Sequence, residues 1–84
     1  IKVNDNINNN NLSCIRIIED DIFSLNYLAI TLSNYIKLYN LKNGSFVTNL
    51  IYHTNKIMHI EYLFEIKLLM SASMDKTVIL WSVI

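Results

Sequence analysis

Residues 53–81 constrain the fold more than any other stretch of this chain. Between 58 and 67 apolar and polar side chains alternate, which is the pattern of a half-buried strand. Two further apolar runs, 68–73 and 77–81, flank the turn-forming segment 74–76. The stretch therefore predicts a strand, a second strand, a tight turn and a third strand. A helix is the competing interpretation, because Ile57, Ile60, Leu63 and Phe64 also fit helical spacing, but the alternation favours a strand.

The preceding residues predict four more strands, at 13–18, 27–32, 35–41 and 46–51. Ser33 and Asn34 predict the turn between the second and third of them. Asn43 and Gly44 predict a type I′ hairpin turn, because both central residues of that turn need a positive φ. No segment resembles a crossover helix, so we expect an all-β fold of antiparallel strands.

Residues 1–11 contain a run of asparagines at 8–11 and predict a flexible, Asn-rich loop or the end of a preceding strand. The chain begins with Ile1, and we expect it to be a piece of a longer protein. Hydrophobic residues make up 52% of the 84 residues and charged residues only 17%. This is apolar for so small a domain, so we expect that residues 12–84 are covered in part by other protein.

Charge and cysteine content exclude several functions. Seven basic and seven acidic residues cancel, and no block of Lys or Arg exists, so we expect no nucleic-acid partner. No apolar run reaches the length of a membrane-spanning helix and no basic amphipathic helix is visible, so we expect no membrane association. The single cysteine, Cys14, predicts a reducing compartment, and thus an intracellular protein of the cytoplasm or nucleus.

Metal and cofactor sites are not expected. The acidic triplet Glu19-Asp20-Asp21 fits a solvated turn better than a cation site. His59 lies beside Glu61 on the polar face of its strand, and two groups are too few to hold a metal.

An internal repeat appears when the sequence is shifted by about 42 residues. The shift places Ile15 on Ile57, Ile18 on Ile60, Ile22 on Phe64, Thr31 on Ser73, Ile36 on Val78, Leu38 on Leu80, and Tyr39 on Trp81. A unit of about 40–45 residues with four strands has the size of one blade of a β-propeller, whose two apolar faces are covered by neighbouring blades.

Residues 53–82 resemble one repeat of the WD-repeat β-propeller family. The landmarks are His53, then apolar residues at 57, 60 and 62, then the pattern Leu-x-Ser-x-Ser-x-Asp-x-Thr over 69–77, and finally Trp81. Residues 11–52, approximately, form a degenerate second copy. The resemblance implies antiparallel four-stranded blades, about two of them, within a larger ring.

The chain departs from the family pattern at several places. Tyr52 replaces the glycine before the histidine, Ser82 replaces the closing aspartate, and residues 64–67 stand in place of a Pro-Asp-Gly turn. In the first copy Tyr39-Asn40 stands for Trp-Asp, Asn11 falls at the histidine, and Ser33-Asn34 falls at the aspartate. We therefore expect the first copy to lack the family's polar network.

His53, Ser71 and Asp75 are also the three residue types of a serine hydrolase. A nucleophilic serine requires an exposed oxygen, usually on a strained glycine-rich turn, whereas Ser71 lies within a predicted strand with no glycine nearby. The family resemblance implies instead a structural hydrogen-bonded tetrad in which Asp75, His53, Ser71 and Trp81 contact one another in that order.

Three functions are left open at this point. The first is a non-catalytic WD-repeat scaffold, whose partners are other blades of the same chain and further proteins of unknown identity. The second is a small β-rich hydrolase using His53, Ser71 and Asp75. The third is a self-contained all-β binding module. We expect the first, with no enzymatic activity, no cofactor and no metal.

Overall fold

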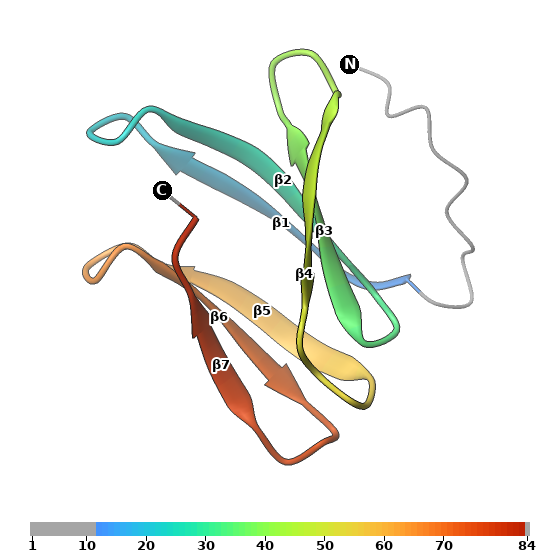
Figure 1. The fold of residues 1–84 in the computed structure, drawn as a ribbon. Coiled ribbons are helices and arrows are strands. Elements are labelled where there is room, and N and C mark those ends of the chain that lie inside the picture. Colours follow the sequence, from blue (N-terminus) through green and yellow to red (C-terminus); the bar gives the residue numbers. More distant parts are fainter. Residues whose placement is uncertain (1–11, 84) are drawn as a thin grey trace.

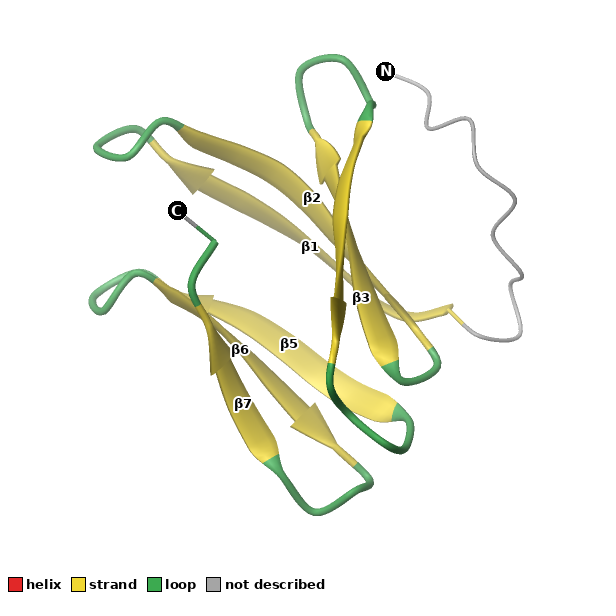
Figure 2. Cartoon of the chain, viewed as in Figure 1, coloured by secondary structure: helices red, strands yellow, loops and turns green. Residues whose placement is uncertain are grey.

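The computed structural model describes residues 12–83, which form two antiparallel sheets and no helix (Figure 1, Figure 2). The first sheet has the strand order β1-β2-β3-β4 and the second has the order β5-β6-β7. The strands are β1 (Leu12–Asp20), β2 (Leu25–Leu32), β3 (Tyr35–Asn40), β4 (Phe46–Ile51), β5 (Ile57–Leu63), β6 (Leu68–Ser73) and β7 (Val78–Trp81). The predicted all-β fold of antiparallel, blade-like sheets is confirmed. The Asn-rich segment 1–11 lies outside the described residues.

Five of the seven strands have boundaries that differ from those expected, and the differences at the ends of β5 and β1 are among the largest. The strand predicted to run to residue 67 ends at Leu63, and residues 64–67 form the turn to β6. Lys67 closes this turn with a φ of 61°, which ends the extended backbone. The competing helix is wrong, because 57–63 is a strand. β1 continues past residue 18 to Asp20, because the carboxylate of Asp20 is buried and held by the second sheet.

The hairpin between β3 and β4 contains Asn43 and Gly44 as predicted, but its turn is not type I′. Gly44 has a positive φ of 75°, whereas Asn43 does not. The Gly44 N–H donates to the carbonyl of Asn40 at 2.8 Å, and the Asn43 Oδ1 accepts from the Ser45 N–H at 2.9 Å. The prediction of a type I′ turn was wrong because the side chain of Asn43 caps a longer turn, a common alternative in hairpins.

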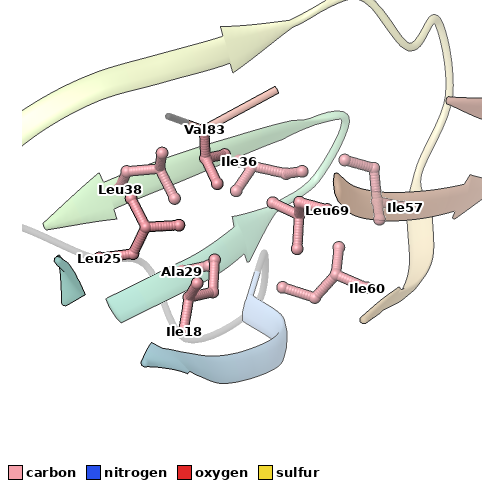
Figure 3. Close-up of a cluster of buried hydrophobic side chains, with 9 residues drawn as sticks. All are labelled: Ile18, Leu25, Ala29, Ile36, Leu38, Ile57, Ile60, Leu69 and Val83. Atoms are coloured by element: carbon pink, nitrogen blue, oxygen red, sulfur yellow. The ribbon is translucent and has the colours of Figure 1, made fainter. Parts of the chain in front are cut away.

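The main core lies between the two sheets, where β1 runs against β5 (Figure 3). In Figure 3 the side chains of Ile57, Ile60 and Leu69 point toward those of the first sheet. The buried members of this core are Ile18, Leu25, Ala29, Ile36, Leu38, Ile57, Ile60, Leu69 and Val83. Face-to-face packing of apolar sheet surfaces is thus what holds the two sheets together.

Hydrogen bonds join the sheets at both ends of this core. At one end the Ile57 N–H donates to the carbonyl of Ser33 at 2.8 Å, and the Ser13 hydroxyl donates to the carbonyl of Ile57 at 3.0 Å. At the other end the Tyr62 hydroxyl donates to the Asp20 carboxylate at 2.9 Å. The sheets are therefore fixed relative to each other along the full length of β1 and β5.

The strand registers show which positions of the two sheets are equivalent. Each sheet begins with a bulge at the start of its first strand, at Ser13 in β1 and at Met58 in β5. Counting from these bulges along the paired strands gives the following equivalent positions: Leu12 and Ile57, Ile15 and Ile60, Ile17 and Tyr62, Ile30 and Ser71, Ile36 and Val78, Leu38 and Leu80, Tyr39 and Trp81.

The sequence shift that revealed the internal repeat describes the third strands of the two sheets and fails for the first strands. Ile36 and Val78, like Tyr39 and Trp81, are matched both by the sequence shift and by the strand registers. Ile15 instead matches Ile60, because the β1–β2 hairpin extends further beyond its bulge than the β5–β6 hairpin does.

Candidate functional site

The structure brings together the four residues of the proposed tetrad, which come from four different segments. His53 lies in the connection between β4 and β5, Ser71 lies in β6, Asp75 lies in the β6–β7 turn, and Trp81 ends β7. Ser71 and Trp81 lie on the same face of the second sheet, the face that packs on the first sheet. Trp81 pairs with Leu69, and Ser71 follows Leu69 by two residues on β6, so all three side chains point to one side. The histidine reaches this face from outside the sheet.

The four side chains form one continuous chain of hydrogen bonds. The His53 Nδ1 lies 2.8 Å from the Asp75 Oδ2, and the His53 Nε2 lies 2.7 Å from the Ser71 Oγ. The Trp81 Nε1–H donates to the Ser71 Oγ at 2.8 Å. Each distance is that of a well-formed hydrogen bond, so the contacts implied by the family resemblance are present in this chain.

The donors and acceptors determine where the protons lie. An ionised carboxylate only accepts and an indole N–H only donates. With a neutral imidazole, His53 donates its Nδ1–H to Asp75 and its Nε2 accepts a hydrogen bond from the Ser71 hydroxyl, while the Ser71 Oγ accepts from Trp81. All four side chains satisfy one another in a single direction, which removes the penalty of about 1–3 kcal/mol for each buried polar group left without a partner.

Asp75 is held by its own turn as well as by the histidine. Its carboxylate accepts from the Thr77 N–H at 2.9 Å, from the Thr54 N–H at 3.0 Å and from the Thr77 hydroxyl. Burial by itself would raise the pKa of Asp75, but the hydrogen bonds from Thr77, His53 and the two backbone N–H groups outweigh it and hold that pKa well below the usual range of a carboxyl group.

Ser73 and Thr77 belong to the site and were not among the predicted tetrad residues. The Ser73 hydroxyl donates to the carbonyls of Asn55 and Lys56 at 2.9 and 3.0 Å and accepts from the Asp75 N–H at 3.0 Å. The signal for both was present in the sequence: Ser73, Asp75 and Thr77 are spaced two apart, the spacing at which side-chain oxygens cap backbone N–H groups in turns.

The first sheet has a cluster of buried side chains at the positions equivalent to Ser71 and Trp81. Ile30 stands where Ser71 does, and Tyr39 stands where Trp81 does. Both are buried, at 5% and 1% exposure, and they pack with Leu32. Ile30 and Tyr39 thus occupy the places of Ser71 and Trp81, while Asn11, at the position of the histidine, lies outside the described residues.

A second polar cluster joins the sheets at the opposite end. Asp20, only 1% exposed, accepts from Lys67 at 2.8 Å and from the Tyr62 hydroxyl at 2.9 Å. The hydrogen bond from Lys67 lowers the pKa of Asp20 and outweighs the burial that would raise it. Burial raises the pKa of Tyr62, and its hydrogen bond to Asp20 raises it further. Sequence reasoning placed Asp20 in a solvated turn, and this was wrong.

The remaining predicted residues lie elsewhere. Asn43 and Gly44 lie in the β3–β4 loop, at the end of the first sheet opposite to the segment that carries His53. The His59 Nε2 lies 3.5 Å from the Glu61 Oε1, and both side chains are largely exposed. Across residues 12–83 no three side chains of His, Cys, Asp or Glu converge on a possible metal position. The same residues contain no helix of the length and apolarity needed to span a membrane.

The order Asp75–His53–Ser71 has the connectivity of a hydrolase triad, but its accessibility does not suit catalysis. Ser71 is fully buried and His53 is 2% exposed. A nucleophilic oxygen has to reach the substrate, whereas the Ser71 Oγ is enclosed and also accepts the hydrogen bond of Trp81. The arrangement is suited to joining three segments of the chain, namely the β4–β5 connection, β6 with its turn, and β7.

Comparisons with protein-family models, with curated proteins and with solved structures found no match to this chain.

Proposed function

We propose that the two sheets are successive blades of a WD-repeat β-propeller, which acts as a non-catalytic scaffold for protein–protein interaction. The outer faces of the two sheets carry this proposal. Ile36 and Leu38 are 0% and 2% exposed between the sheets, whereas Val78 and Leu80, at the equivalent positions of the second sheet, are 62% and 52% exposed.

The other outer face supports the same conclusion. Ile60 is fully buried against the first sheet, while Ile15, its equivalent on the outer face of the first sheet, is 50% exposed. The outer face of the second sheet is thus open at Val78 and Leu80, and that of the first sheet is open at Ile15, although Ile30 and Tyr39 on the same face are buried. Repetition of this packing on both sides is how blades build a ring, and it explains the apolar composition of the chain.

The buried tetrad fits this role. His53, Ser71, Asp75 and Trp81 form the pattern for which the WD-repeat resemblance was proposed, and the hydrogen bonds among them fix the segment that leads into β5. Binding surfaces of a scaffold of this kind lie on its loops and rim, so partner choice is independent of the tetrad.

The hydrolase alternative is disfavoured by the burial of Ser71, and the self-contained module by the exposed apolar side chains on both outer faces. A direct test of the scaffold proposal is the coding sequence that surrounds these 84 residues. We expect it to supply further units of about 42 residues, enough for the 4–8 blades of a ring. A reading frame without such units would contradict the proposal, as would hydrolysis of a simple ester that Ser71→Ala abolishes.

A further inference from the structure

The turns of the β1–β2 and β5–β6 hairpins form an exposed apolar surface at one end of the molecule. In Figure 1 both turns lie on the left. Four apolar side chains of these turns are exposed: Ile22 (77%), Phe23 (42%), Phe64 (54%) and Ile66 (55%). We call these four residues the hairpin-turn surface. Turn positions normally carry Gly, Asn, Asp or Ser, so four large apolar side chains here are unusual.

The two turns are fixed to each other by the polar cluster beneath them. The Lys67 ammonium contacts the buried Asp20 carboxylate at 2.8 Å and lies 3.6 Å from the centroid of the Phe64 ring. It also lies 5.5 Å from the centroid of Phe23 in the other turn. One cation therefore holds an aromatic ring of each turn, so that the surface is shared between the two sheets.

Packing of further blades does not account for this surface. The four residues lie in turns, beyond the paired positions of their strands, whereas a neighbouring blade covers the faces of a sheet. Ile22 and Ile66 would stay exposed with both outer faces covered. The hairpin-turn surface is thus a feature distinct from the open faces that support the propeller proposal.

The charged residues around the hairpin-turn surface indicate what kind of partner could bind there. Exposed carboxylates at Glu19, Asp21 and Glu65 flank the four apolar residues, while the positive charge of Lys67 is compensated by Asp20. The exposed Lys42 lies in the β3–β4 loop, at the same end of the first sheet as the β1–β2 turn, and its single positive charge leaves the three carboxylates in excess. An acidic rim repels anionic lipids and phosphates and attracts lysine and arginine side chains.

We propose that the hairpin-turn surface is a docking site for an amphipathic segment of a partner protein, with an apolar stripe flanked by lysine or arginine. This inference rests on the proposed scaffold function and adds to it the chemistry of one partner. The apolar side chains of the segment would cover Ile22, Phe23, Phe64 and Ile66, and its basic side chains would face the carboxylates of the rim.

The test uses a labelled synthetic peptide long enough for five helical turns, with Leu at helical spacing and Lys elsewhere, and a matched peptide with Glu in place of Lys. Fluorescence anisotropy measures their affinities for the chain. We expect Ile22→Ser/Ile66→Ser to weaken binding of the Lys peptide by about tenfold or more, because both residues would be central contacts. The control Val47→Ser/Ile51→Ser removes two exposed apolar side chains of β4 and should change the affinity less than about twofold.

Charge reversal gives a second, independent readout. Asp21→Lys/Glu65→Lys should transfer the preference from the Lys peptide to the Glu peptide. Absence of binding, equal affinity for both peptides, or an unchanged affinity in Ile22→Ser/Ile66→Ser would overturn the inference. So would binding to phosphatidylserine vesicles, or self-association, that depends on Ile22 and Ile66 in place of peptide binding. None of these outcomes affects the propeller proposal, which the surrounding coding sequence tests separately.

Discussion

The two sheets share the same pattern of strand pairing and differ in the side chains that occupy equivalent positions. Both begin with a bulge and run through antiparallel strands in the same register. Around Trp81 the second sheet carries hydrogen-bonded side chains from the β4–β5 connection and the β6–β7 turn. Around Tyr39, at the equivalent position, the first sheet carries Ile30 and Leu32. The same strand register therefore accommodates the hydrogen-bonded tetrad in the second sheet and the buried side chains around Tyr39 in the first.

The difference shows what the tetrad contributes. An apolar cluster stabilises by the area it buries and has no preferred partner geometry. The tetrad also ties down a segment outside the ladder, because His53 and Thr54 both contact Asp75. Position 53 lies between β4 and β5 and is thus fixed by side-chain hydrogen bonds. The substitutions below are designed to separate these two modes of stabilisation, beginning with the largest expected effect.

A lysine introduced at equivalent positions of the two sheets should destabilise the first sheet strongly and the second sheet very little. Leu38→Lys places an ammonium group in the covered core, where Leu38 is 2% exposed, and we expect it to unfold the chain. Leu80→Lys places the same group where Leu80 is 52% exposed, and we expect a change below about 0.5 kcal/mol in the free energy of unfolding. Urea unfolding followed by circular dichroism measures both.

The same two substitutions test whether the outer face of the second sheet is covered in the full-length protein. In the proposed propeller Leu80 would be covered by the next blade, so Leu80→Lys should strongly destabilise the full-length protein. Equal effects of Leu38→Lys and Leu80→Lys in the 84-residue chain would contradict the assignment of the two faces, and a harmless Leu80→Lys in the intact protein would contradict the packing of a further blade.

Substitutions at the equivalent residues Tyr39 and Trp81 should lower the free energy of unfolding by different amounts. Tyr39→Ala removes a ring that is 1% exposed and should cost about 3–5 kcal/mol, as deletions of large buried side chains do. Trp81→Phe keeps most of the ring and removes the donor to Ser71, so it should cost about 1 kcal/mol. Chemical unfolding reports both values. A loss in Trp81→Phe as large as in Tyr39→Ala would mean that packing, and not the hydrogen bond, dominates at Trp81.

Acid should weaken the second sheet through Asp75. The folded protein lowers the pKa of this carboxyl group, so the resulting stability is present above the unfolded pKa of about 3.9 and is lost as the pH falls toward the lower folded value. Asp75→Asn should therefore be less stable than the parent at neutral pH and should lose less stability below pH 4. Asp20, whose pKa is also lowered, retains its own acid dependence and serves as the internal control. An unchanged acid profile in Asp75→Asn would contradict the role of this carboxylate.

The sequence predicted the strands and the tetrad well because both have strong local signals. Alternating apolar residues marked the strands, and the spacing of His53, Ser71, Asp75 and Trp81 matched a known pattern. The turns were harder to predict. Ser24, Ser33, Lys67 and Lys76 all have a positive φ, although residues with a Cβ atom disfavour it. With one glycine in the chain, the positive φ falls on serine and lysine residues, whose type does not indicate a left-handed backbone conformation.

The cluster around Asp20 could not be predicted for a different reason. Asp20, Tyr62 and Lys67 come from separate hairpins and meet only because the two sheets pack face to face. A carboxylate next to two other acidic residues looks solvated in the sequence, and its burial follows from the tertiary packing alone. The hairpin-turn surface escaped prediction in the same way, because its residues come together across the two sheets.

Hydrogen exchange of the Trp81 indole N–H tests the central claim most directly, namely that the tetrad is an intact buried chain of hydrogen bonds. Trp81 is the single tryptophan, so its indole gives one resolved signal in a ¹⁵N-correlated NMR spectrum. We expect strong protection in the parent chain, with exchange only through unfolding, and markedly faster exchange in Ser71→Ala. Exchange at the rate of free tryptophan in the parent, or unchanged protection in Ser71→Ala, would contradict the account.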